Sequence, residues 1–213
     1  QIARCFRDED QRGDRQPEFT QLDIEMSFVD SKDVMDLNEK LMIALCKALA
    51  PDKKLLHEPF PRITWHDAMN RYGSDKPDIR FGMEIVDGSE IFRASKFKVF
   101  ADTLRNGGVV KMLKVEGAAS FPRSKLDGLE ELAKIHGAKG LAYIVWEASI
   151  ESGALKSPIL KFLDEKEIDA VKKATEMKQG DIVFFAADTF VTACTAIGQV
   201  RLKCADEFKM RDP

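Results

Sequence analysis

Residues 2–28 read IARCFRDEDQRGDRQPEFTQLDIEMSF, and their pattern predicts the structure of the N-terminal part of the chain. The segment from Ile2 to Phe6 is apolar enough for a β-strand, whereas residues 7–16 are polar and charged. From Leu22 to Phe28 apolar and polar residues alternate, which is the period of a half-buried strand. The pattern predicts a strand, a long polar loop and an antiparallel returning strand.

A helical pattern follows the predicted sheet. Apolar residues recur every three or four positions, at Val34, Leu37, Leu41, Leu45 and Ala48. Pro51 prevents the pattern from continuing, because proline lacks the backbone N–H that a helix needs. We expect a helix that begins near Asp33 and packs on the preceding sheet.

A short helix is predicted between the two halves of the chain. Thr64 and Asp67 have the spacing of a capping box at the start of Trp65–Tyr72. Gly73 favours a helix end at this point. The composition changes after this helix, and we expect a domain boundary near Asp78.

The second half has the pattern of an α+β module of normal domain size. Strands are predicted at Phe97–Phe100, Val109–Val115, Leu141–Trp146 and Ile182–Ala186. Helices are predicted at Ser124–His136, Asp164–Ala174 and from Thr189 to about Cys204. Ser124 and Asp127 have the spacing of a capping box, and so do Asp164 and Glu167.

Composition places the chain among ordinary globular proteins. It has 213 residues, of which 44% are hydrophobic and 32% charged, and its 33 basic and 36 acidic residues give a net charge of −3. This balance argues against a wholly basic nucleic-acid binder. No apolar run approaches the roughly 18 to 20 residues that span a bilayer, and the start lacks the apolar core of a signal peptide. The chain opens at Gln1 without a methionine, which suggests a piece of something longer.

Cysteine spacing indicates thiols rather than disulfides. The cysteines are Cys5, Cys46, Cys194 and Cys204, and they form no CxxC pair. They are predicted to be buried thiols in a reducing compartment, which favours the cytoplasm. Cys194 and Cys204 share an apolar pattern with Phe190 and Ile197 and are expected in the core.

Residues 1–16 carry four arginines and four carboxylates. One interpretation is a solvated loop with weak local ion pairs. The other follows from strand alternation, which puts Arg7 and Glu9 on the same surface. A guanidinium there can bind phosphate or carboxylate in bidentate fashion, and Glu9 can accept hydrogen bonds from a base amine or from metal-bound water.

The stretch RCFRDEDQRGDRQPEFTQLDIEMSF, residues 4–28, closely resembles motif 2 of the class II aminoacyl-tRNA synthetases. It is most similar to the bacterial-type aspartyl-tRNA synthetases, in which FRDED leads into a loop ending DRQPEFTQ. The resemblance continues through YGSDKPDIRFG at residues 72–82. Farther on, HGAKGLAYI, GALKSP and GDIVFFAAD are similar to the insertion domain of the bacterial enzymes, called GAD.

The resemblance implies a reaction in which L-aspartate and ATP form aspartyl-adenylate, and the aspartyl group then passes to the 3′ end of tRNA. It implies that Arg7 is catalytic and holds the ATP α-phosphate and the aspartate carboxylate together, with Mg²⁺ assisting. ATP contacts are implied for Arg7, Asp8, Glu9 and Gln16. Contacts with the tRNA acceptor end are implied for Arg12 and Arg15. No residue is assigned to a metal.

The implied fold class is α+β. Residues 1–77 would form part of the antiparallel class II catalytic sheet with its helix, residues 78–209 the GAD domain, and residues 210–213 the return to the catalytic domain. Motif 1, motif 3, an aspartate-recognition loop and an anticodon-binding barrel are not found in the sequence. The whole enzyme would be a homodimer, and this stretch alone would be inactive. The alternative is a noncatalytic tRNA- or protein-binding module, although such a module would not need FRDED or DRQPEF.

Three histidines and a pair of acidic residues are weaker candidates. His57, His66 and His136 have no metal-ligand spacing and are expected at the surface or in packing. Asp23 and Glu25 face away from the apolar stripe and could line the same cleft as Arg7. No GxxxxGK[ST] phosphate loop occurs.

Two basic groups remain. Lys76 and Arg80 could contact tRNA or belong to a structural linker. A second set could form a tRNA-facing patch, although a solvated face is the better interpretation, and it contains Lys111, Lys114, Arg123 and Lys125.

Overall fold

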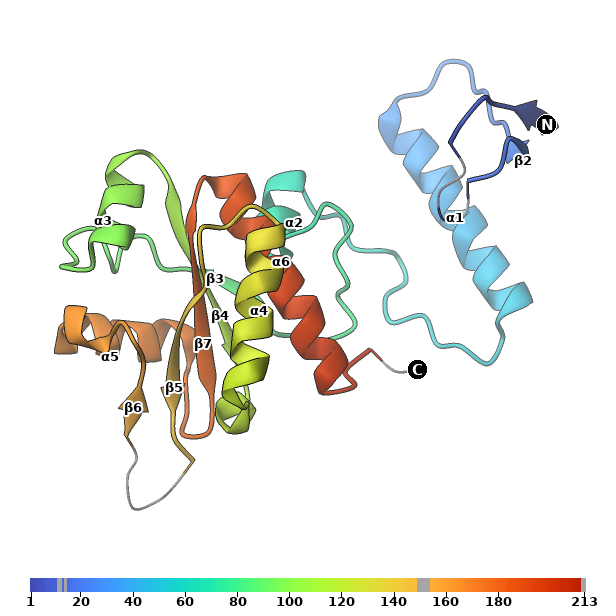
Figure 1. Ribbon diagram of the computed structural model, residues 1–213. Coiled ribbons are helices and arrows are strands. Elements are labelled where there is room, and N and C mark those ends of the chain that lie inside the picture. The colour runs from blue at the N-terminus through green and yellow to red at the C-terminus, as the bar shows by residue number, and fades with distance from the viewer. Residues whose placement is uncertain (11–12, 14, 149–153, 212–213) are drawn as a thin grey trace. The chain divides into compact units, whose positions relative to one another are not determined.

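The computed structural model describes residues 1–10, 13, 15–148 and 154–211 (Figure 1). The chain divides into two compact units, Gln1–Pro61 and Arg62–Pro213. The described part is α+β, with two antiparallel sheets and six α-helices. Within it, no helix combines the length and the apolar character needed to cross a membrane.

The first unit begins with a β-hairpin. Strand β1 (Ile2–Phe6) pairs with β2 (Glu18–Leu22), so that Ile2 lies opposite Leu22 and Phe6 opposite Glu18. The predicted strand pair is confirmed, but the returning strand was placed wrongly at residues 22–28. Asp23 N–H donates to the carbonyl of Gln1 at 2.8 Å, where the chain reaches the end of β1. The alternating residues beyond this point have no strand to pair with.

Helix α1 (Ser31–Leu49) is the other element of the first unit. A capping box of Asp30 and Asp33 starts it, and Ala50 ends it one residue before Pro51. The predicted helix is confirmed. Its predicted packing on the sheet is not, because no described residue of α1 is buried.

The second unit is built on a five-stranded antiparallel sheet with the order β3-β4-β7-β5-β6. The strands are β3 (Ile85–Asp87), β4 (Val109–Val115), β5 (Ala142–Trp146), β6 (Leu155–Lys156) and β7 (Ile182–Asp188). The central strands β4, β5 and β7 confirm the predicted ones. The short β3 and β6 were not predicted.

Helices cover both faces of this sheet (Figure 1). One face carries α4 (Arg123–Ile135) and α6 (Phe190–Glu207), with Phe184 and Leu113 in the core between them and the sheet. The opposite face carries α3 (Lys98–Arg105) and α5 (Glu165–Thr175), packed around Phe100 and Phe185. The sheet is therefore the middle of three layers.

The start of α3 corrects the strand predicted at residues 97–100. Phe97 is the N-cap of this helix, and Phe97, Phe100 and Ala101 have helical rather than alternating spacing. The rings of Phe97 and Phe100 meet edge to face at 4.7 Å, so they pack in an aromatic cluster. A segment of four residues, three of them apolar, did not distinguish this helix from a strand.

The two predicted capping boxes of the second half have different outcomes. Asp164 and Glu167 form the box at the start of α5. The predicted box of Ser124 does not form, because α4 begins at Arg123 without a side-chain cap. Asp127 instead accepts a hydrogen bond from Arg123 Nε at 2.8 Å.

Helix α2 (Trp65–Tyr72) belongs to the second unit. Thr64 caps its start by accepting from the backbone N–H of Asp67, which is one half of the predicted capping box. The Asp67 carboxylate accepts instead from the Thr64 hydroxyl, at 2.6 Å. Gly73 ends the helix in the left-handed conformation, as predicted. The helix packs against α6 and β3. The expected domain boundary near Asp78 therefore falls inside this compact unit, which begins at Arg62.

Candidate functional site

The hairpin of the first unit brings Arg7, Glu9 and Arg15 together. Arg7 follows the last residue of β1, and its backbone N–H donates to the carbonyl of Pro17 at 2.8 Å. Glu9 lies between two guanidinium groups, with Oε2 at 3.2 Å from Arg15 Nη1 and Oε1 at 4.0 Å from Arg7 Nη1. The shared surface of Arg7 and Glu9 that alternation predicted is therefore present.

These side chains line a pocket of about 340 Å³, which we call the hairpin pocket. Its described lining residues are Arg7, Glu9, Arg15, Gln16 and Phe19. The Arg7 guanidinium lies over the Phe19 ring, 5.0 Å from its centroid. Four of the residues predicted to bind ATP or tRNA thus line one pocket.

Phe19 was missed by the sequence analysis. It lies on β2, opposite Cys5 of β1, and the returning strand predicted at residues 22–28 does not include it. The signal was available in the sequence, since Phe19 is the first aromatic residue after the polar loop.

The charges of the hairpin pocket favour an anionic ligand. The side chains of Arg7 and Arg15 are 60% and 67% exposed, whereas that of Glu9 is 27% exposed. Glu9 orients the two cations, and both guanidinium groups keep donors available to solvent. Two arginines side by side can bind phosphate or carboxylate oxygens in bidentate fashion.

The other acidic candidates of the first unit lie elsewhere. Asp8 and Glu25 are exposed and are not among the described lining residues of the hairpin pocket. Asp23 is partly buried and accepts a hydrogen bond from Gln21 Nε2. Arg12 lies outside the described residues.

The proposed basic patch of the second unit does not form. Lys111 is fully buried, and its ammonium group lies 2.6 Å from both Asp87 Oδ2 and Asn70 Oδ1. Lys111 is therefore neither a tRNA-facing nor a solvated residue. Lys114 pairs with Glu116, Arg123 with Asp127, and Lys125 with Glu207, at 2.7–2.8 Å.

The two basic residues Lys76 and Arg80 have different surroundings. Lys76 is exposed, whereas Arg80 donates two hydrogen bonds to the Asp78 carboxylate, at 3.0 and 2.7 Å. The hydrogen bonds from Arg80 hold the pKa of Asp78 below its usual value. Arg80 therefore has a structural partner within its own loop.

Arg201 was not predicted at all. It lies on α6, is fully buried, and donates to four backbone carbonyls of the segment 78–83. Its guanidinium also lies over the rings of Phe81 and Tyr72, at 4.1 and 5.1 Å. The Arg201 side chain thus links residues 78–83 to α6.

The cysteines divide between the units. Cys194 and Cys204 are fully buried as predicted, and burial raises their pKa to about 11 and about 12. Cys5 and Cys46 are only partly buried, so the prediction of buried thiols is wrong for them. They lie in the unit in which no described residue is buried.

The histidines form no metal centre in the part of the chain that the structure describes. No group of three or more His, Cys, Asp or Glu side chains there could hold an ion. His66 stacks on Phe190 with ring centroids 4.9 Å apart, which is a packing role.

Comparisons with known proteins identify the family to which this sequence belongs. The family model described as tRNA synthetases class II (D, K and N) matches residues 1–197. The aspartate–tRNA ligase of Geobacillus kaustophilus is 50% identical over 213 residues, which are 100% of this chain and 35% of that protein. The aspartate–tRNA(Asp/Asn) ligase of Syntrophomonas wolfei is 48% identical over 95% of this chain and 34% of that protein.

The chain thus spans about a third of the length of the curated relatives it matches. The family match covers the hairpin pocket and extends through the second unit into the first half of α6. This chain belongs to the class II tRNA synthetases of the D, K and N type.

Proposed function

We propose that this chain is part of an ATP-dependent aspartate–tRNA ligase and that the hairpin pocket is one side of its active site. The observation that carries the proposal is the pair of guanidinium groups, Arg7 and Arg15, held around Glu9 beside the Phe19 ring. Relatives named aspartate–tRNA ligase support the choice of substrate class.

In this proposal Arg7 assists adenylate formation. The aspartate carboxylate attacks the α-phosphorus of ATP in line, a P–O bond to the β-phosphate breaks, and pyrophosphate leaves. Two anions must approach each other, and a fixed guanidinium between them reduces their repulsion in the transition state. The aspartyl group then passes from the adenylate to the terminal ribose of tRNA.

The other residues of the pocket have supporting roles in the same proposal. Glu9 and Gln16 can hydrogen-bond with the nucleotide, and Asp8 follows Arg7 directly at the end of β1. Phe19 offers an aromatic surface on which a purine base can stack. Arg15, and Arg12 of the same loop, are proposed to reach the acceptor end of tRNA.

Mg²⁺ assists the reaction in the family that the sequence resembles, but the described residues do not form a site for it. Magnesium prefers carboxylate, phosphate and water oxygens. Both carboxylate oxygens of Glu9 face guanidinium groups, and the described residues contain no cluster of metal-ligating side chains. We therefore assign no step of the reaction to the ion.

We further propose that residues 78–209 form a GAD insertion domain within the second unit, and that residues 210–213 lead back towards the catalytic domain. The phrases of sequence that resemble GAD fall on elements of one sheet. GDIVFFAAD covers β7, and HGAKGLAYI leads into β5. The whole enzyme is proposed to act as a cytoplasmic homodimer.

Substitution of Arg7 tests the proposed reaction. In the full-length enzyme, Arg7→Lys should slow aspartate-dependent ATP–pyrophosphate exchange by about 100-fold or more, because lysine cannot donate in bidentate fashion to two anions. Arg93→Lys is the matched control, since Arg93 is an exposed arginine paired with Glu90 on the second unit. Near-normal exchange by the Arg7 variant, or exchange that does not depend on aspartate, would contradict the proposal.

A further inference from the structure

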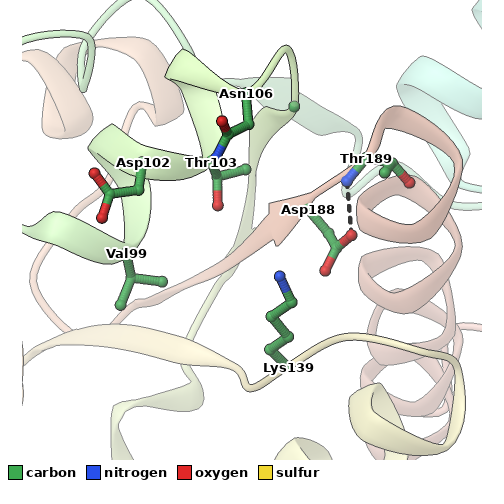
Figure 2. A pocket seen from close by; sticks show the side chains of 8 residues that line it. Val99, Asp102, Thr103, Asn106, Lys139, Asp188 and Thr189 are labelled. Carbon is green, nitrogen blue, oxygen red and sulfur yellow. Dashed lines mark hydrogen bonds between the residues drawn. The ribbon is translucent and has the colours of Figure 1, made fainter.

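A pocket of about 330 Å³ lies at the C-terminal end of β7, among residues of the second unit alone (Figure 2). We call it the polar pocket after the hydrogen-bonding side chains among its lining residues. Its walls come from α3, from the loop before β4 and from the start of α6. The polar side chains that line it are Asp102, Thr103, Asn106, Lys139, Asp188 and Thr189. None of them belongs to the hairpin pocket.

Two side chains of opposite charge, Lys139 and Asp188, line this polar pocket. The Lys139 side chain extends towards Asp188, as Figure 2 shows. Asp188 accepts a hydrogen bond from the backbone N–H of Thr189 at 2.8 Å. Among the residues that the structure describes, neither Lys139 nor Asp188 has an ion-pair partner within 4.0 Å. Asp102, by contrast, pairs with Arg105 at 2.9 Å.

The wall of the polar pocket is closely packed at Gly108. A Cβ atom at this position would lie 2.6 Å from Thr103 Cγ2 and 2.7 Å from the carbonyl oxygen of Asp188. Gly108 therefore lies in close contact with both Thr103 of α3 and Asp188 of β7. This packing fixes the separation of the groups that line the pocket.

An apolar pocket of about 430 Å³ adjoins the polar one and shares Val99 and Lys139 with it. Its apolar lining includes Phe97, Phe100, Leu141, Ile159 and Phe185. The rings of Phe100 and Phe185 are 5.8 Å apart, and both side chains also belong to the core. The apolar pocket is large enough for an aromatic or branched side chain.

We propose that the two pockets together bind a free α-amino acid with a large apolar side chain. Lys139 binds the carboxylate of the ligand, Asp188 binds its ammonium group, and the side chain enters the apolar pocket past Val99. A simple amine would leave Lys139 without a partner, and a simple carboxylic acid would leave Asp188 without one. The ligand differs from aspartate, and the site uses no residue of the proposed reaction at Arg7.

Titration of the whole chain with small ligands tests the proposal. L-phenylalanine and L-leucine should shift the amide resonances of Gly108 and Thr189, with dissociation constants of about 1–10 mM, as expected for about a dozen atoms in an open site. Phenethylamine and 3-phenylpropionate, which each lack one of the two charges, should bind about 5-fold more weakly or worse. L-aspartate should not shift these resonances.

Variants separate the two charged contacts from general effects. Lys139→Met and Asp188→Asn should each weaken L-phenylalanine binding by about 5-fold or more. Lys173→Met and Asp169→Asn make the same changes at exposed positions of α5 and should leave binding unchanged. Val99 is 52% exposed, so Val99→Trp should fold and block the passage between the pockets.

Three results would overturn this inference: no shifts with any amino acid, equal binding of the one-charge analogues, or unchanged affinity in the Lys139 and Asp188 variants. Each of them leaves the proposed reaction untouched, because that reaction is tested at Arg7. Loss of pyrophosphate exchange in the Arg7 variant likewise says nothing about Lys139 and Asp188.

Discussion

Lys111 and Arg201 are fully buried cations of the second unit, and their hydrogen-bond partners differ in kind. Lys111 has a carboxylate partner, Asp87. Burial alone would raise the pKa of Asp87, but hydrogen bonds from Lys111 and Ser89 outweigh it and lower that pKa. The pair, together with Asn70, joins α2 to the strands β3 and β4.

Arg201 instead bonds to backbone carbonyls. Its Nε donates to Met83 at 2.9 Å, and its Nη2 donates to Asp78, Phe81 and Gly82 at 2.9–3.2 Å. Burial lowers the pKa of this guanidinium from its ordinary value. The charge is retained because several carbonyl dipoles and two aromatic faces surround it.

Removing Arg201 should therefore destabilise the second unit strongly. Arg201→Met removes four hydrogen bonds made by a fully buried guanidinium to partly buried carbonyls, so we expect the free energy of unfolding to fall by about 3 kcal/mol or more. Urea unfolding followed through Trp65 and Trp146 measures this, since both tryptophans lie in the second unit.

Arg93→Met is the control for this substitution, because the Arg93 side chain is 67% exposed and its pair with Glu90 is solvated. Its effect should stay within about 0.5 kcal/mol. Equal unfolding midpoints for the two variants would show that Arg201 does not hold the segment in place.

At the scale of elements, the contact between α2 and α6 depends on two glycines. Gly73 ends α2 with a φ of 72°, and Gly198 lies inside α6 against it. A Cβ atom on Gly198 would come within 2.8 Å of Gly73 Cα and 2.9 Å of the Tyr72 carbonyl oxygen. The two backbones approach so closely that neither position has room for a side chain.

Gly198→Ala should consequently destabilise the second unit by about 1–3 kcal/mol, although alanine favours a helix more than glycine does. Gly128→Ala is the matched test on α4, because a Cβ there would meet nothing within 4 Å. That change should stabilise the unit by about 0.5–1 kcal/mol. If both variants unfold at higher urea concentration than the parent chain, the close approach of α2 and α6 does not constrain position 198.

The long helices were predictable from the sequence, and the two shortest strands were not. The periodic patterns of α1, α4, α5 and α6 extend over three or more turns, so helical spacing identified them. The strands β3 and β6 have only three and two residues. The strand placed at residues 22–28 failed because alternation indicates a possible strand but supplies no partner for it.

The charged residues of the candidate site were predictable, but its aromatic residue was not. Strand alternation predicted the shared surface of Arg7 and Glu9, and the family resemblance added Arg15 and Gln16, which line the same pocket. Phe19 required the correct register. Lys111 was placed on the surface because lysine usually lies there. Its position in the middle of VVKMLKV, an otherwise largely buried strand, was the available signal for a buried ion pair.

At the scale of the whole molecule, the two units differ in the amount of core that they contain. Across the described part of residues 1–61 no side chain is buried, and apolar residues such as Ile2, Phe6 and Leu49 are 67–79% exposed. The second unit has one cluster of buried apolar residues on each face of its sheet. Burial of apolar surface is the main source of folding stability, so the second unit should be far more stable by itself.

Limited proteolysis of the 213-residue chain should reveal this difference. Trypsin at low concentration should cut first in residues 1–61, for example after Lys53 or Lys54, because a unit without a core opens at little cost in free energy. A fragment that begins between Lys54 and Ile63 and extends to about Arg211 should persist, and intact-mass measurement identifies it. Digestion in urea is the control, since it should produce cuts throughout both units. Equal survival of the two halves under native conditions would mean that the hairpin and α1 are held by more than the described contacts provide.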